Sequence, residues 1–104
     1  MRTMEVILIH TAIGIFSPEF MKTNIEFGKT IKTGKSPYGT LVSTYMDSGK
    51  MRLFCTWDVA NVENLVPLLG QMALLGWNTE VIPVQKTPDG LSNIEKALAQ
   101  MAKK

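Results

Sequence analysis

The chain is poor in the residues that build disulfides and metal sites. Its 104 residues include one cysteine, Cys55, and one histidine, His10. A single cysteine cannot form a disulfide within the chain, and it excludes a zinc site built from several cysteines. One histidine without carboxylates at ligand spacing argues against a metal site made by side chains. We therefore expect no metal and no other cofactor, and the cysteine count favours a cytoplasmic protein.

Charge and long apolar runs are scarce as well. Charged residues make up 19% of the chain and the net charge is +2, so neither a nucleic-acid partner nor a membrane surface is favoured. No stretch reaches the roughly 18 apolar residues that a membrane span needs. The N-terminal stretch MRTMEVILIHTAIGIF resembles a signal peptide, but Glu5 and His10 interrupt it and no cleavage pattern follows. We expect no nucleic-acid partner, no membrane and no targeting segment.

What the chain does have is apolar residues. They make up 45% of the sequence, which excludes disorder and allows one hydrophobic core. With so few charges left for the surface, the composition favours an oligomer. We expect a single domain over residues 1–104 with its core in residues 4–86.

Four strands are predicted, over residues 4–11, 40–47, 50–57 and 77–85. The first is apolar at nearly every position, which is typical of a central strand covered on both faces. The second and third are joined by the turn DSGK and form a hairpin. Pro83 cannot donate a ladder hydrogen bond, so it favours an edge position for the fourth strand.

Three helices are predicted between and after these strands. Ser17 and Pro18 indicate the start of the first, which should run to about Thr33, and the segment GKSPYG after it reads as a loop. The second follows the third strand and is capped by either Asn61 or Asn64. Ser92 and Glu95 form a capping box at the start of the third, over residues 92–103.

The order of these elements, β-α-β-β-α-β with a C-terminal helix, is that of the α+β ferredoxin-like fold. In that fold a four-stranded antiparallel sheet has the order 4-1-3-2 and two helices cover one of its faces. The first and third strands carry apolar residues on both alternating sets, such as Leu8 against Ile9 and Cys55 against Phe54. A sheet that is apolar on both faces must be covered on both, and a second copy of the same sheet is the simplest cover.

The strand LFCTWD, which leads into the second helix, and the returning strand TEVIPV resemble those of a small group of unknown function in the dimeric α/β-barrel superfamily. The sequence likeness covers residues 53–84, and the likeness in architecture covers residues 4–85. The resemblance implies ferredoxin-like subunits that pair sheet to sheet and enclose a cavity. Wider members look like muconolactone isomerases, monooxygenases and haem proteins, and no catalytic signature carries over to this chain.

His10 lies at the end of the first strand, where polar residues of the neighbouring strands are expected. Its predicted neighbours are Arg52, either Tyr45 or Asp47, and either Asn78 or Glu80. A histidine among such groups could transfer protons near neutral pH. The alternative is a histidine at a strand end with ordinary hydrogen bonds.

Other chemistry-bearing residues have simpler interpretations. Cys55 has no second histidine to activate it and reads as a buried, inert thiol. Trp57 and Trp77 either pack in the core or an interface, or line a pocket. The stretch GKTIKTGKS lacks the spacing of a phosphate loop. Five methionines could fill the core or form a compliant lining for an apolar ligand: Met21, Met46, Met51, Met72 and Met101.

These observations predict a homodimer that binds a small lipophilic molecule, fatty-acid-like or aromatic, in a cavity between sheet and helices or between paired sheets. A second hypothesis is a cofactor-independent monooxygenase or isomerase, in which His10 transfers protons while Tyr45 or Arg52 steadies negative charge. A third is a structural or regulatory dimer without a ligand. The expected ligand-binding residues are Tyr45, Arg52, Phe54, Trp57, Trp77 and Glu80.

Overall fold

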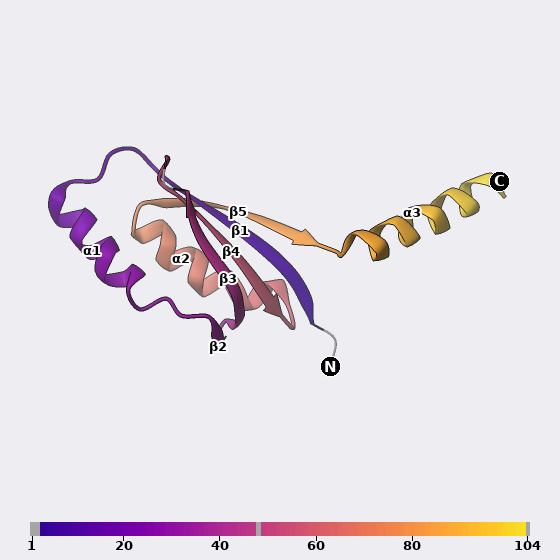
Figure 1. The fold of residues 1–104 in the computed structure, drawn as a ribbon, viewed down its shortest axis with the longest axis horizontal. Helices are drawn as coiled ribbons and strands as arrows, with labels where there is room; N and C mark the ends of the chain where they lie inside the picture. Colours follow the sequence, from indigo (N-terminus) through magenta and orange to yellow (C-terminus); the bar gives the residue numbers. More distant parts are fainter. Residues whose placement is uncertain (1–2, 48, 104) are drawn as a thin grey trace.

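A computed structural model describes residues 3–47 and 49–103. The fold is α+β, with an open antiparallel sheet of five strands and three α-helices in the described part of the chain (Figure 1). The strands are β1 (Met4–Ala12), β2 (Gly34–Ser36), β3 (Gly39–Asp47), β4 (Arg52–Val59) and β5 (Trp77–Val84). The helices are α1 (Pro18–Gly28), the short 3-10 helix η1 (Val62–Leu65), α2 (Val66–Leu74) and α3 (Thr87–Ala102).

The strands lie in the order β2-β3-β4-β1-β5. The apolar strand β1 therefore has a neighbour on each side, as its composition predicts. Strand β5 lies at an edge, which agrees with the position of Pro83 in it. The hairpin of β3 and β4 is also present, with Asp47 paired to Arg52 beside its turn.

Strand β2 is a fifth strand where the sequence predicts a loop. The hydroxyl of Ser36 accepts a hydrogen bond from the amide of Tyr38 and donates one to the carbonyl of Gly39, which folds the chain into a tight turn. Gly39 has a φ of 142° in this turn, and a Cβ there would lie 2.6 Å from the Val59 side chain. Because only glycine fits, the chain reverses here and Gly34–Ser36 pairs with the start of β3.

The first helix starts as predicted but ends earlier. The Ser17 side chain accepts from the Phe20 amide and caps the first turn. The helix ends at Gly28, not near Thr33. The hydroxyl of Thr30 donates a hydrogen bond to the carbonyl of Phe27, which replaces the backbone hydrogen bond that a further helical turn would have formed with that carbonyl.

The second helical segment begins at one of the two predicted caps. Asn61 caps η1 by accepting a hydrogen bond from the amide of Glu63. Pro67 then lies in the first turn of α2, where its missing N–H costs no helical hydrogen bond. The alternative cap, Asn64, lies inside η1.

The C-terminal helix begins five residues before the predicted start. Pro88 lies in its first turn with Asp89, so these residues set the start and Ser92 lies within the helix. Figure 1 shows α3 extending away from the sheet. The radius of gyration is 17.1 Å, against about 13 Å for a compact domain of this length. The apolar side chains of α3 are exposed: Leu91, Ile94, Leu98 and Met101.

The two faces of the sheet differ in their cover. Helices α1 and α2 lie on the same side (Figure 1), and we call the face beneath them the helix-side face. Alternate residues of β1, such as Val6 and Leu8, are fully buried there. The opposite, open face carries Ile7 and Ile9, which are half-buried. The core on the helix side consists of Val6, Leu8, Leu41, Cys55, Trp57, Val59, Leu65, Leu68, Met72 and Trp77.

Candidate functional site: two cavities under the helices

His10 points toward the helices. It lies on β1 in line with the buried Val6 and Leu8, and its side chain is 2% exposed. Its cross-strand partners are Leu53 and Thr79. Directly paired residues project from the same face of a sheet, so these two share the helix side with His10.

The polar neighbours expected for His10 lie on the other face, so that prediction is wrong. Arg52 pairs with Thr11, and Glu80 pairs with Ile9, each one residue away from the position opposite His10. A difference of one residue moves a side chain to the opposite face. The same alternation places Tyr45, Asp47, Phe54 and Asn78 on the open face.

The environment of His10 keeps its imidazole neutral. Nδ1 lies 2.6 Å from Oγ1 of Thr79. Burial disfavours the charged ring and lowers the pKa of His10 to about 4. At pH 7 the ring is therefore uncharged, with one nitrogen that donates and one that accepts.

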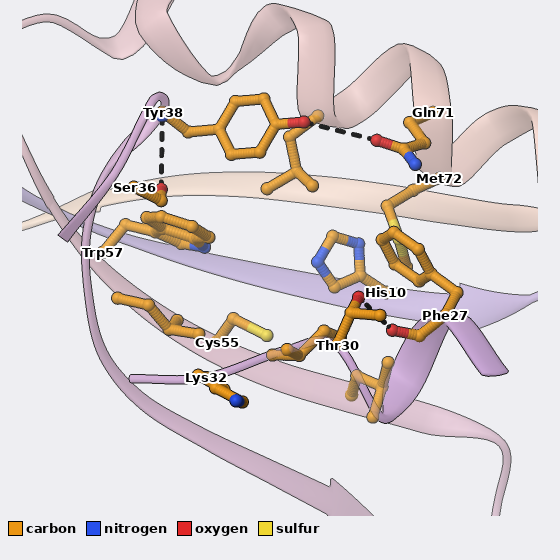
Figure 2. Close-up of a pocket in the computed structure, with 14 residues that line it drawn as sticks. His10, Phe27, Thr30, Lys32, Ser36, Tyr38, Cys55, Trp57, Gln71 and Met72 are labelled. Atoms are coloured by element: carbon orange, nitrogen blue, oxygen red, sulfur yellow. Dashed lines mark hydrogen bonds between the residues drawn. The ribbon is translucent and has the colours of Figure 1, made fainter. Parts of the chain in front are cut away.

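A cavity of about 270 Å³ opens beside His10, and we call it the His10 cavity (Figure 2). Its walls combine aromatic and aliphatic side chains with a few polar groups. The hydroxyl of Tyr38 donates to Oε1 of Gln71 at 3.3 Å, and the Tyr38 ring packs edge-on against Trp57 with centroids 6.2 Å apart. The lining residues are His10, Phe27, Thr30, Ile31, Lys32, Ser36, Tyr38, Leu41, Leu53, Cys55, Trp57, Leu68, Gln71 and Met72.

A second cavity of about 420 Å³ adjoins the first. Four of the five methionines singled out in the sequence line it, and Met101 lies on α3 instead. We call it the methionine cavity. It shares four wall residues with the His10 cavity, namely Phe27, Ile31, Leu53 and Met72. The flexible side chain of Met72 thus stands between two apolar spaces, as a compliant lining would require.

Helix α1 forms one wall of the methionine cavity and is anchored by Asn24, its one buried residue. The Asn24 amide nitrogen donates to the carbonyls of Phe20 and Leu75, both at 3.1 Å. Its oxygen accepts from Nε1 of Trp77 at 2.7 Å. Asn24 therefore joins α1 to the end of α2 and the start of β5.

The predicted ligand-binding residues are divided between the two faces. Trp57 lines the His10 cavity and Trp77 lines the methionine cavity. The other four lie on the open face. There the guanidinium of Arg52 lies 2.7 Å from the Asp47 carboxylate and 5.4 Å from the centre of the Phe54 ring. The pKa of Asp47 is lowered, mainly because its carboxylate accepts hydrogen bonds from the Arg52 guanidinium.

Sequence reasoning missed four polar groups of the His10 cavity: Thr30, Ser36, Tyr38 and Gln71. Gln71 is the one polar side chain in the otherwise apolar helix α2. A lone polar residue in such a helix is a pattern that the sequence alone displays. Tyr38 gave none, because its place depends on the turn that leads from β2 to β3. The position of Thr30 depends likewise on the early end of α1.

Cys55 lies in the wall of the His10 cavity. It is buried, and burial raises the pKa of its thiol above the ordinary value. A thiol with a raised pKa is protonated at neutral pH and is a poor nucleophile. The geometry agrees with the interpretation of Cys55 as inert.

Residues 3–47 and 49–103 provide neither a cluster of metal-ligating side chains nor a helix that could span a membrane. Within them, no group of three or more His, Cys, Asp or Glu side chains gathers as a metal site would require. None of the helices in the same ranges is long and apolar enough to cross a membrane.

Comparison with known proteins finds no family model, no curated protein and no solved structure that matches this chain.

Proposed function

We propose that this protein binds a small lipophilic molecule with one polar end in the His10 cavity. The supporting observation is the composition of the walls, in which apolar side chains surround a small number of polar groups. Such walls are typical of ligand sites, since apolar contacts provide affinity and a few polar groups fix the orientation. The adjoining methionine cavity offers room for a longer ligand.

The protein is, in this proposal, a homodimer of the dimeric α/β-barrel type. The long strands in the order β5-β1-β4-β3 support a ferredoxin-like subunit. The open face supports a second copy, because Ile7, Ile9 and Phe54 are only half-buried in the single chain. We place the dimer in the cytoplasm because of its single cysteine.

The geometry favours binding over proton transfer by His10. A histidine with a pKa of about 4 is a weak base at pH 7. Tyr45 and Arg52, which the enzymatic hypothesis pairs with His10, lie on the opposite face of the sheet. A purely structural dimer is less favoured too, since its subunits have no need of two adjoining cavities.

Native mass spectrometry of the full-length purified protein tests the proposal. We expect the mass of a dimer with a copurified molecule of low mass. The variant Thr30→Trp places an indole at the rim of the His10 cavity, so it should lose the molecule and remain a dimer. Lys22→Trp, on the exposed surface of α1, is the matched control and should retain it.

Two results would contradict the proposal. A protein that carries no molecule and binds no added apolar probe would exclude the binding function. A chain that remains a monomer at all concentrations would exclude the dimer.

A further inference from the structure

The indole N–H of Trp57 is a buried donor without an acceptor. Trp57 is 6% exposed, and no described residue offers its Nε1 a hydrogen-bond partner. The other tryptophan differs, because Nε1 of Trp77 donates to Asn24 at 2.7 Å. Buried polar groups in proteins are nearly always paired, so an unpaired donor on the wall of a cavity indicates an acceptor that the cavity is built to receive.

His10 supplies a second donor to the same cavity. The hydroxyl of Thr79 has one proton, and His10 Nδ1 is its only hydrogen-bond partner among the described residues. When that hydroxyl donates to Nδ1, the neutral ring carries its own proton on Nε2. In this tautomer the Nε2–H has no acceptor among the described residues, so it is also available to a ligand.

The two donors belong to the same cavity. Trp57 and His10 both line it, and in Figure 2 a nitrogen of the imidazole ring is on the side that faces the indole of Trp57. Two N–H groups that converge on one oxygen form the arrangement that proteins use to hold a carbonyl group.

We infer that the polar end of the ligand is an uncharged carbonyl group, whose oxygen accepts from Nε1 of Trp57 and Nε2 of His10. The inference rests on the proposed binding function and names the ligand class within it. Phe27, Leu68 and Met72 would surround the apolar body of the ketone, aldehyde or ester.

A carboxylate suits these donors less well. Both are neutral, and a carboxylate buried without an opposite charge is strongly disfavoured. The only cation among the lining residues is Lys32, whose side chain is exposed. In Figure 2 its amino group points away from His10 and Trp57.

Three naphthalenes of similar shape test the inference: 2-acetylnaphthalene, 2-ethylnaphthalene and 2-naphthoate. An apolar cavity of roughly 150 Å³ holds benzene, so a cavity of about 270 Å³ has room for two rings. Calorimetry on the full-length protein should give the ketone at least about tenfold higher affinity than either the hydrocarbon or the carboxylate.

The two tryptophans allow a direct readout in proton–nitrogen NMR spectra. The ketone should move the indole N–H signal of Trp57 downfield, since that proton gains an acceptor. The signal of Trp77 should stay in place because its proton already has one in Asn24. The hydrocarbon should leave both indole signals without a downfield shift.

Variants separate the two donors. Trp57→Phe keeps an aromatic ring but removes the N–H, so affinity for the ketone should fall about tenfold while affinity for 2-ethylnaphthalene is unchanged. Thr79→Val removes the hydroxyl that fixes the tautomer of His10, and a fall of about threefold for the ketone alone is expected. If Trp57→Phe does not fold, the NMR shift of the native protein and the affinities of Thr79→Val still test whether the ligand carbonyl accepts from these two donors.

The possible outcomes are distinguishable. Equal binding of ketone and hydrocarbon would overturn the inference and leave the proposed function in place. Tightest binding of 2-naphthoate would also overturn it and indicate an anion site. If none of the three compounds binds, both the inference and the proposed function fail.

Discussion

At the residue scale, the direction of one side chain determines what His10 can do. The sequence identifies His10 as a residue of interest, and its place at the end of a central strand could be predicted. Its face could not, because the face depends on the register between β1 and its neighbours. The predicted partners Arg52 and Glu80 belong to the correct strands and lie one residue away from the positions that share a face with His10.

Burial of His10 predicts a loss of stability in mild acid. Its pKa is about 4 in the folded protein and about 6.5 when unfolded. Between these values the unfolded chain binds a proton that the folded chain does not, so the free energy of unfolding falls as the pH falls. We expect a loss of about 3 kcal/mol between pH 7 and pH 4, measured by urea unfolding at each pH.

His10→Gln is the control for this prediction, because glutamine has no charge to gain and can still bond Thr79. The chain has one histidine, so the difference between the two pH curves isolates its titration. Parallel curves for the native protein and the variant would mean that His10 is not buried as described.

At the scale of elements, α1 is held by a few specific bonds rather than by a broad apolar face. Asn24 is its one buried residue, and the methionine cavity lies against it. Apolar side chains of the helix, including Ile25, remain exposed. An element with so little buried surface is expected to open more easily than the sheet does.

Removal of Asn24 should therefore loosen α1. Asn24→Ala leaves the Trp77 N–H and the Leu75 carbonyl without their partner, and we expect the free energy of unfolding to fall by about 3 kcal/mol. The indole signal of Trp77 should shift in NMR spectra while that of Trp57 stays in place.

The matched control is Asn93→Ala on the exposed helix α3, where the amide bonds only Gln85. Its effect should be within about 0.5 kcal/mol. An Asn24→Ala protein as stable as the control would show that packing, and not this network, holds α1.

Much of the fold at this scale could be predicted from local signals. Ser17, Asn61 and Pro83 each act through the backbone next to them, and each lies where the sequence indicates. The misses have tertiary or competing causes. The turn of Gly39 against Val59 creates β2, and Pro88 starts α3 ahead of the capping box at Ser92. In the His10 cavity, Ser36 and Tyr38 depend on the same turn near Gly39 and Thr30 depends on the early end of α1, so these polar groups were missed as well.

At the scale of the whole molecule, two apolar surfaces lack a cover in the single chain. One is the open face of the sheet, and the other is the apolar side of α3, where Leu98 is 59% exposed. Along β1 and β4, buried residues of the helix-side face alternate with half-buried residues of the open face. Apolar residues thus lie on both faces of the sheet, as the sequence predicts for a sheet covered on both. In the proposed dimer, a second copy would remove the open face of the sheet from water.

A charge on the open face should weaken the proposed dimer. Ile82 lies on β5 and is 37% exposed in the single chain, so Ile82→Glu is tolerated by the subunit but would bury a carboxylate between paired sheets. We expect sedimentation equilibrium to give a dissociation constant at least about tenfold higher than that of the native protein.

Leu74→Glu provides the comparison, since Leu74 is 83% exposed at the end of α2, on the helix side. This variant should associate as the native protein does. If Ile82→Glu also leaves association unchanged, the open face is not the dimer interface.

The central place of β1 also bears on how the chain is made. Both partners of β1 come later in the sequence, since β4 begins at Arg52 and β5 at Trp77. During synthesis about 40 residues separate the end of β1 from the start of β4, which takes about 2–8 s at 5–20 residues per second. During that interval the apolar strand β1 has no neighbouring strand of its own chain to form hydrogen bonds with. Glu5 and His10, which interrupt the apolar run, give the nascent segment the polar groups that discourage it from pairing with another nascent chain.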